Sequence, residues 1–226
     1  MPGNSELAAW LRLTLAPGIG GETQRRLLAA FGLPERIFSA SPASLASAMP
    51  LKLAEQLLSY DAQDEIEAAL AWAAAPGNAI LTLADAAYPQ RLLDTPDPPT
   101  VLYAMGRTQL LNAPAIAIVG SRNASGAGRS FTDRLVRDLT GNGFAIASGL
   151  ARGIDTRAHE AALGFGTIAV LAGGLDRPYP AENIDLMRRI CETGAVISEM
   201  PFGWEPRGRA FPRRNRIISG LCYGSV

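Results

Sequence analysis

The stretch AIAIVGSRNASGAG, residues 115–128, decides the fold of this chain. The apolar run AIAIV suits a strand buried on both faces of a sheet, and the glycine-rich turn after it leads into a helical pattern over residues 128–140. The alternation repeats, with strands expected at 144–147, 167–171 and 195–198 and helices at 155–163, at 181–192 and from 215 onward. Short apolar strands alternating with helices predict an α/β fold with a doubly wound, mostly parallel sheet.

Upstream of this repeat the sequence changes character. Residues 79–83 and 101–103 suit two further short strands joined by a proline-rich connection, whereas residues 1–76 read as amphipathic, alanine-rich helices. The longest helix is expected over Leu51 to Ala75, and the turn Pro76-Gly77-Asn78 after it marks a boundary. We therefore predict a small all-α domain over 1–76 and a sheet domain over 77–226.

The charge is distributed unevenly along the chain. Residues 1–114 carry 7 Lys+Arg against 11 Asp+Glu, whereas residues 115–226 carry 14 basic residues, all of them Arg, against 10 acidic ones. The turn Pro17-Gly18-Ile19-Gly20 could present backbone N–H groups to a DNA phosphate as a helix-hairpin-helix. It could equally be a plain turn in a sterile-alpha-motif-like bundle, and the acidic balance of this half favours the plain turn.

The cysteines and the apolar stretches of the sequence indicate the cellular environment of the protein. Cys191 and Cys222 match neither a metal-site spacing nor a disulfide framework, so we expect a reducing, cytoplasmic environment and no bound metal or cofactor. The N-terminus shows no basic segment followed by an apolar run, and every apolar stretch is far shorter than about 20 residues. We therefore expect neither a signal peptide nor a membrane span.

Glycine and arginine gather in the loops that follow the expected strands. The carboxyl ends of parallel strands form the ligand-binding edge of such sheets, where glycines let a ligand approach the backbone and arginines supply fixed positive charge. Aromatic residues among the arginines of the last loop suit base stacking. The sequence thus predicts a groove that captures phosphates. Our candidate DNA-binding residues are Gly120, Ser121, Arg122, Gly149, Arg152, Gly153, Gly173, Phe211, Arg214, Asn215 and Arg216.

The segment FPRRNR, residues 211–216, is expected to form the second wall of this groove. Pro212 biases Phe211 toward an extended conformation, and Phe211 is our candidate for base stacking in preference to Trp204. Asn215 is expected to cap a helix, with Arg214 and Arg216 contacting DNA on either side of it.

Signals for catalysis are weak. His159 lies inside an expected helix, four residues after Asp155, which we expect to be that helix's N-cap; a lone helical histidine is more often structural. Glu199 is conceivable as a general base, but neither a second catalytic group nor a metal cluster accompanies it. We expect a protein that is not an enzyme.

Several of these segments together carry a resemblance. The chain resembles the bacterial DNA-processing protein A family (DprA, also called Smf), and the order and spacing of the matching segments agree over nearly the whole chain. The segments are YPQRLLDTPDPPTVLYAMG (88–106), AIVGSRNAS, ASGLARGIDTRAHEAAL (147–163), TIAVLAGGLDRPYPAEN (167–183), ISEMPFG (197–203) and FPRRNRIISGL (211–221).

The resemblance implies a sterile-alpha-motif-like domain followed by an extended Rossmann domain. It further implies single-stranded DNA binding, homodimerisation and loading of the RecA recombinase during natural transformation. The family's Rossmann domain continues past Gly224 with another strand and a helix, which puts the dimer and RecA-binding surfaces in doubt here. The alternative is a Rossmann-type nucleotide hydrolase similar to the nucleoside-monophosphate phosphoribohydrolases. Their PGGxGTxxE pattern supplies a catalytic glutamate, which the corresponding AGGLDRPYP lacks.

Overall fold

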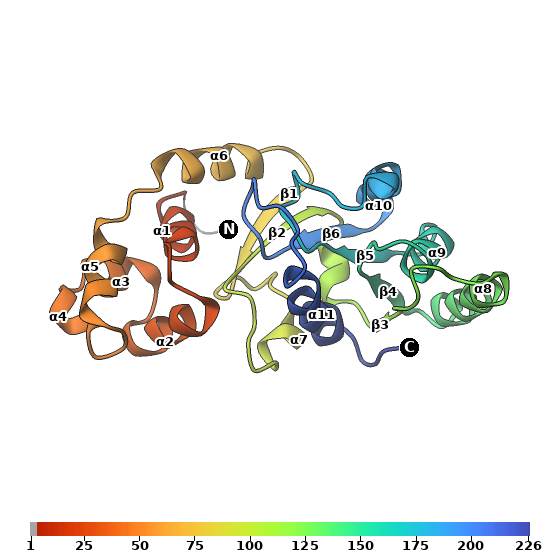
Figure 1. Ribbon diagram of the computed structural model, residues 1–226, viewed down its shortest axis with the longest axis horizontal. Coiled ribbons are helices and arrows are strands. Elements are labelled where there is room, and N and C mark those ends of the chain that lie inside the picture. Colours follow the sequence, from red (N-terminus) through yellow and green to blue (C-terminus); the bar gives the residue numbers. More distant parts are fainter. Residues whose placement is uncertain (1–3) are drawn as a thin grey trace.

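A mixed sheet organises the larger part of the molecule in the computed structural model, which describes residues 4–226 (Figure 1). Its strand order is β1-β2-β6-β5-β4-β3, with β3 to β6 parallel to one another and β2 antiparallel to both β1 and β6. This confirms the predicted α/β class with a mostly parallel sheet. The strands are β1 (Asn78–Thr82), β2 (Val101–Gly106), β3 (Ala115–Ala117), β4 (Ala145–Ser148), β5 (Thr167–Val170) and β6 (Ala195–Ser198).

Helices cover both faces of the sheet. Helices α8 (Gly126–Gly141), α9 (Ile154–Ala162) and α10 (Ile184–Thr193) lie on one face, with α7 (Gln90–Leu93) and α11 (Ala210–Leu221) on the other (Figure 1). Every residue of β4, β5 and β6 is buried, and alternate residues of β5 enter the cores on opposite faces. The continuous apolar strands of the sequence are therefore explained by burial on both faces. Two short 3₁₀ helices, η1 (Thr108–Asn112) and η2 (Ala181–Asn183), complete the connections.

The order of the strands reverses direction at β3. The chain runs from β3 through β4 and β5 to β6, then returns along α11 to the opposite side of β3. There Ala117 N–H donates to the carbonyl of Gly224 and Val226 N–H donates to the carbonyl of Ala117, both at 2.9 Å. Such a switch point leaves a crevice at the carboxyl end of the first strand, where open α/β sheets bind ligands. Gly120 to Arg122 follow β3 at this point.

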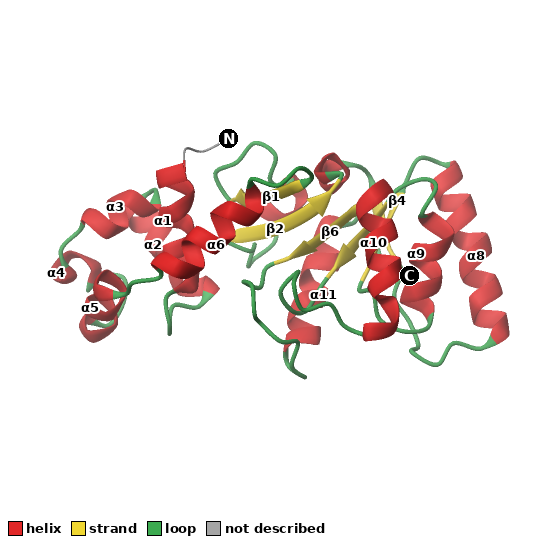
Figure 2. Cartoon of the chain, turned by 90° about the horizontal axis from the view of Figure 1, so that it is seen from above, coloured by secondary structure: helices red, strands yellow, loops and turns green. Residues whose placement is uncertain are grey.

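The helical end contains α1 (Asn4–Leu15), α2 (Gly21–Phe31), α3 (Pro34–Ser39), α4 (Pro42–Leu45), α5 (Leu51–Ser59) and α6 (Gln63–Ala73). These helices enclose a core of their own, but α1 and α6 also contribute to the core on one face of the sheet. Trp10 and Ile66 are buried there together with Ile80, Val101 and Tyr103. Figure 2 shows α6 lying between the helical cluster and the sheet. The division at residue 76 falls between α6 and β1, and its standing as a domain boundary stays a prediction.

The prediction of a single helix over Leu51–Ala75 is wrong, because the helix is interrupted between α5 and α6. The side chain of Arg12 donates to the carbonyls of Leu58 (2.7 Å) and Tyr60 (3.1 Å). These carbonyls therefore have a partner outside the helix at the point where α5 ends. The Asp61 carboxylate then accepts from Gln63 N–H at the start of α6 (3.0 Å). The break thus depends on a contact with α1. Between residues 4 and 226, no helix is both long and apolar enough to cross a membrane.

Candidate nucleic-acid interface

A small depression, the aromatic hollow, lies beside the carboxyl ends of β3 and β4. Its volume is about 200 Å³. It brings together four of the residues predicted from the sequence, namely Arg122, Gly149, Arg152 and Phe211, although they come from three different loops and helices. The remaining lining residues are Asn123, Ala151, Tyr179 and Pro180.

Two aromatic rings and one arginine lie next to one another in the hollow. The Tyr179 and Phe211 rings lie 5.7 Å apart between centroids at an angle of 60°, and the Arg122 guanidinium lies 5.5 Å from the centre of the Phe211 ring. Tyr179 is half exposed, at 50%. Within residues 4–226, Arg122 makes no ion pair with a carboxylate. Open ring surface beside an unneutralised cation suits a base with its attached phosphate.

The expected extended conformation of Phe211 is wrong, because Phe211 lies in the first turn of α11. That helix begins at Ala210, with Pro212 as its third residue. The first N–H groups of a helix have no partner within the helix, so a proline is tolerated there. Asn215 is consequently in the middle of the helix and is not its N-cap; its side-chain carbonyl accepts from Arg214 Nε at 3.1 Å.

Arg214 is buried beneath the hollow, and the predicted direct contact with DNA is corrected accordingly. Only 6% of the residue is exposed. Its Nη1 donates to the carbonyls of Gly149 (2.6 Å) and Val170, which ties α11 to the ends of β4 and β5. Burial lowers the pKa of Arg214 to about 10, and the nearby Asp155 opposes that shift. The side chain therefore supports the floor of the hollow.

Gly149 and Asp155 complete this support. A Cβ atom at Gly149 would lie 2.4 Å from Arg214 Nη2, so the guanidinium occupies the space that any side chain would need. Asp155 lies inside α9 and is not its N-cap, a position taken by Gly153; its Oδ2 accepts from the N–H groups of Gly149 (3.1 Å) and Ala151 (3.3 Å). Burial raises the pKa of Asp155, while these backbone donors and Arg214 act against the rise.

The other predicted glycines hold loops together. Gly153 has φ +80°, and a Cβ there would lie 2.1 Å from the carbonyl oxygen of Ser121, so only glycine lets α9 begin against that turn. The Ser121 carbonyl accepts from Ile154 N–H (3.1 Å), which fixes the Gly120–Arg122 turn to α9. Gly173 is buried beneath the Trp204–Pro206 segment, so its predicted contact with a ligand is corrected to a packing role.

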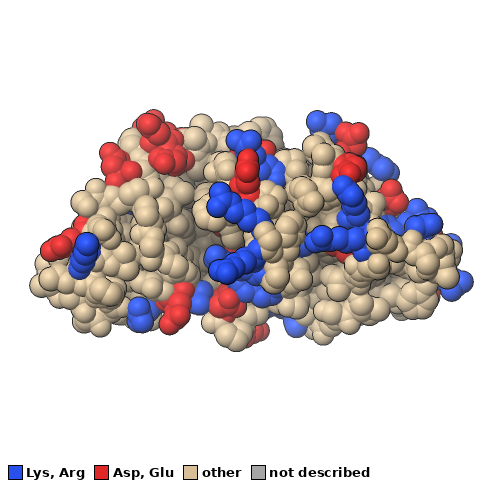
Figure 3. Space-filling model, in the orientation of Figure 1, with Lys and Arg blue, Asp and Glu red and all other residues tan. Residues whose placement is uncertain are grey.

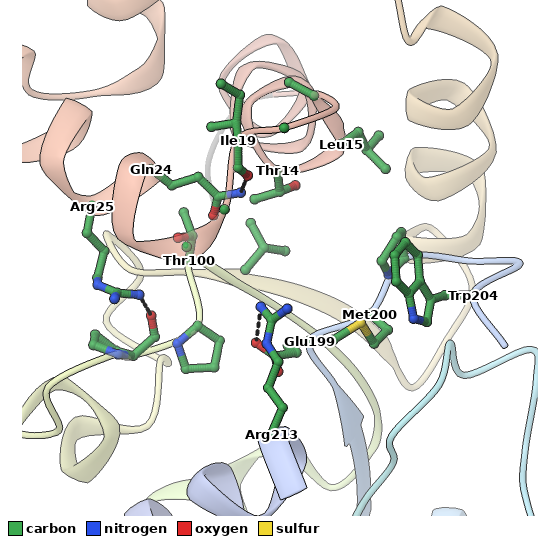
Figure 4. A pocket seen from close by; sticks show the side chains of 18 of the residues that line it. Thr14, Leu15, Ile19, Gln24, Arg25, Thr100, Glu199, Met200, Trp204 and Arg213 are labelled. Atoms are coloured by element: carbon green, nitrogen blue, oxygen red, sulfur yellow. Dashed lines mark hydrogen bonds and ion pairs between the residues drawn. The ribbon is translucent and has the colours of Figure 1, made fainter. Parts of the chain in front are cut away.

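Arg216 faces a different depression, the α2–α11 cleft, whose volume is about 490 Å³ (Figure 4). Its guanidinium is paired with Glu199 and with Asp97 (2.9 Å), and its side chain is 22% exposed. Two carboxylates thus neutralise the cation that we predicted to contact DNA, and the contact itself stays a prediction. In the same cleft Arg213, whose side chain is 53% exposed, pairs with Glu199 at 3.2 Å. Trp204 stands at the other side.

The side chains of Glu199 and His159 are both buried and bound to neighbouring residues of the fold. The Glu199 side chain is 6% exposed; burial raises its pKa, and Arg216 and Arg213 oppose the rise. His159 is fully buried, and its Nδ1 lies 2.7 Å from the Thr167 hydroxyl, which itself donates to a backbone carbonyl. Burial lowers the pKa of His159 to about 3, so the ring stays neutral at ordinary pH and donates from Nδ1.

On the face drawn in Figure 3, Lys and Arg side chains gather over the part that contains the sheet, whereas acidic side chains predominate over the helical end. Arg152 is paired with Glu182 at 2.5 Å, and both side chains are 59% exposed. A surface pair of this kind is weak, so a phosphate can replace the carboxylate. Sequence reasoning did not single out Tyr179, although an aromatic residue two positions after Arg177, in the loop that follows β5, was a usable signal.

Comparisons with known proteins identify the family of the chain and agree with its fold. Residues 79–226 match the family model described as DNA recombination-mediator protein A. The chain is 36% identical to Protein Smf of Synechocystis sp., covering 96% of this chain and 57% of that protein. It is 43% identical over 147 residues to the DNA processing protein DprA of Streptococcus pneumoniae, covering 64% of this chain and 52% of that protein.

Two solved structures are also similar. DNA processing protein A from Streptococcus pneumoniae superposes with a TM-score of 0.81 at 31% identity, covering 99% of this chain and 77% of that one. The second has a TM-score of 0.60 at 34% identity and covers 65% of this chain and 67% of that one. Its description concerns the single-stranded DNA binding mode of DNA processing protein A from Helicobacter pylori. The chain spans 57% and 58% of the length of two curated Smf relatives. By family match and by identity, this chain belongs to the DNA recombination-mediator protein A family.

Proposed function

We propose that this chain binds single-stranded DNA in the aromatic hollow. The observation that carries the proposal is the convergence of Arg122, free of any carboxylate partner in the described part of the chain, with the rings of Phe211 and Tyr179. Arg122 holds a phosphate, and a base stacks on the exposed ring surface. The neighbouring Helicobacter pylori protein, described by its single-stranded DNA binding mode, supports the same ligand.

The chemistry of the hollow favours a single strand of any sequence. Every base has a π-face, and phosphate contacts carry no sequence information. In a duplex the bases are already stacked and paired, so they are not available to Phe211 without unstacking. We therefore expect a preference for single strands with little preference among bases.

The finer role that we propose is that of a non-catalytic, cytoplasmic mediator. It protects incoming DNA and loads RecA in natural transformation, acting as a homodimer. This part rests on family membership, and the chain spans only 57% and 58% of the length of two curated relatives. RecA filament assembly on single strands coated with single-strand-binding protein, measured with and without this protein, tests the loading.

The primary test is a salt series of binding to an oligothymidine and to a blunt duplex. We expect tighter binding of the single strand, with log K falling by about 0.7 for each phosphate contact per decade of salt. The measurement is fluorescence anisotropy at matched ionic strengths. Equal affinity for the two forms at every salt concentration would contradict the proposal, because stacking in the hollow would then contribute nothing.

Replacing Phe211 with leucine is expected to weaken single-strand binding roughly tenfold, since stacking on an aromatic side chain contributes about 1–3 kcal/mol per base. The salt slope should stay constant because no charge is removed. Trp204→Leu is the matched control, being an exposed aromatic of the α2–α11 cleft. If Phe211→Leu binds normally and melts at a much lower temperature, the ring is a packing residue and the stacking assignment is wrong.

A further inference from the structure

A second depression continues from the aromatic hollow. This α8–α9 furrow lies at the amino-terminal ends of α8 and α9 and has a volume of about 420 Å³. Arg122 and Asn123 line both depressions, so the two are continuous at the turn after β3. The other lining residues of the furrow are Ala124, Arg129, Gly153, Thr156, Arg157 and Glu160.

The lining of the furrow differs in chemistry from that of the hollow. Its lining contains no aromatic residue, so nothing there offers a surface for stacking a base. What it offers is three arginines, two hydroxyl or amide side chains and a single carboxylate. That set suits a sugar–phosphate backbone.

One of the three arginines is already committed to the structure. Arg157 on α9 binds both carboxylate oxygens of Asp133 on α8, at 2.5 and 2.7 Å, and also binds Glu160 at 3.1 Å. Hydrogen bonding to Arg157 lowers the pKa of Asp133, in keeping with a formed ion pair. Arg157 therefore links the two helices that wall the furrow and also pairs with Glu160, the carboxylate that lines it, although one cation shared by two carboxylates leaves one negative charge there.

The remaining two arginines are free to bind an anion. Within residues 4–226, neither Arg122 nor Arg129 forms an ion pair with a carboxylate. The exposed Arg129 side chain donates from Nη1 to the carbonyl of Ala124, which turns it back along α8 toward the loop that carries Arg122. Two unneutralised cations thus lie along one continuous track.

We propose that a single strand leaving the aromatic hollow continues into the α8–α9 furrow, where Arg129 contacts a further phosphate without any contact to the base. The inference rests on the proposed function, because it extends the strand held by Arg122 and Phe211. It assigns different tasks to the two depressions: the hollow takes a base with its phosphate, and the furrow takes backbone alone. A basic groove that tracks the backbone beside a stacking site is a general arrangement for single strands.

The test compares Arg129→Ala with Arg134→Ala across oligothymidines of increasing length, starting from a dinucleotide. Arg134 is the matched control, since it is exposed on the same helix but does not line the furrow. We expect Arg129→Ala to bind the shortest oligonucleotides like the unaltered protein and to lose roughly three- to tenfold in affinity for longer ones. Its salt slope should fall by about 0.7, the contribution of one phosphate. Removing the bases from the part of the strand beyond the hollow should leave the affinity unchanged.

The outcomes separate this inference from the function on which it rests. If Arg129→Ala matches Arg134→Ala at every length, while Arg122→Ala weakens binding, the furrow is not part of the track and the hollow remains the site. If Arg122→Ala and Phe211→Leu also bind normally, the proposed function fails together with the inference. A loss for Arg129→Ala that is equal at all lengths would overturn the inference too, because Arg129 would then act within the hollow. Thermal melting confirms that each variant is folded.

Discussion

Replacing Arg122 with alanine should remove most of the affinity for single-stranded DNA while leaving the protein folded. Arg122 is exposed and lines both the aromatic hollow and the α8–α9 furrow, so its phosphate contact lies at the junction of the proposed track. A charge-assisted hydrogen bond of this kind contributes about 1–3 kcal/mol, so its loss raises the dissociation constant roughly 5- to 150-fold. Anisotropy titrations of an oligothymidine measure the change.

Arg189→Ala provides the control for charge alone. Arg189 is exposed on α10 and lines none of the depressions described above. Its removal lowers the net charge equally but should change the affinity little. A folded Arg122→Ala protein with an unchanged dissociation constant would contradict the assignment of the hollow.

Arg214→Met is expected to have the largest effect on stability. Methionine keeps much of the length of the side chain but leaves the Gly149 and Val170 carbonyls without their donor, and it leaves the buried Asp155 carboxylate without its cation. Leaving a buried carbonyl without its donor typically costs about 1–3 kcal/mol, and here two carbonyls lose theirs while Asp155 loses a nearby cation. Urea unfolding followed by circular dichroism gives the loss in free energy of unfolding.

The double variant Arg214→Met/Asp155→Asn separates the two causes. Neutralising Asp155 should recover part of the lost stability, because the unpaired buried charge is then removed. The reverse pattern, unchanged stability together with lost DNA binding, would restore the direct contact that the sequence suggested for Arg214. A supporting role for Arg214 thus predicts lost stability, whereas a direct contact predicts lost DNA binding at unchanged stability.

The sequence could predict which residues meet at the carboxyl edge of the sheet, because the residues that follow a strand are a local property of the sequence. Glycine and arginine directly after apolar strands pointed to Arg122, Gly149 and Arg152, and these residues do line one hollow with Phe211. The roles of neighbouring arginines could not be predicted in the same way. Arg214 is buried and Arg216 is paired with two carboxylates because of where α11 lies against the sheet. No pattern within FPRRNR carries that information.

The errors in element boundaries have the same origin. The helix break near Tyr60 depends on hydrogen bonds from Arg12, 48 residues earlier in the sequence. The residue before Pro212 locally prefers an extended conformation, yet α11 begins before it. Packing of Ile217, Ile218 and Leu221 on the sheet outweighs that local preference. Local rules located the elements well, whereas contacts between distant segments set their ends.

The shared core between the helical end and the sheet limits how this protein could have been assembled in evolution. Trp10 and Ile66 cover Ile80, Val101 and Tyr103, so a sheet separated from residues 1–76 would present an apolar face to water. Exposed faces of this kind favour aggregation or a substitute partner. The amino-terminal helices therefore cannot be replaced by an unrelated helical domain without exposing this apolar face. Any replacement has to carry apolar residues that fit this face of the sheet. Substitutions in the helices and in the sheet are therefore expected to depend on one another.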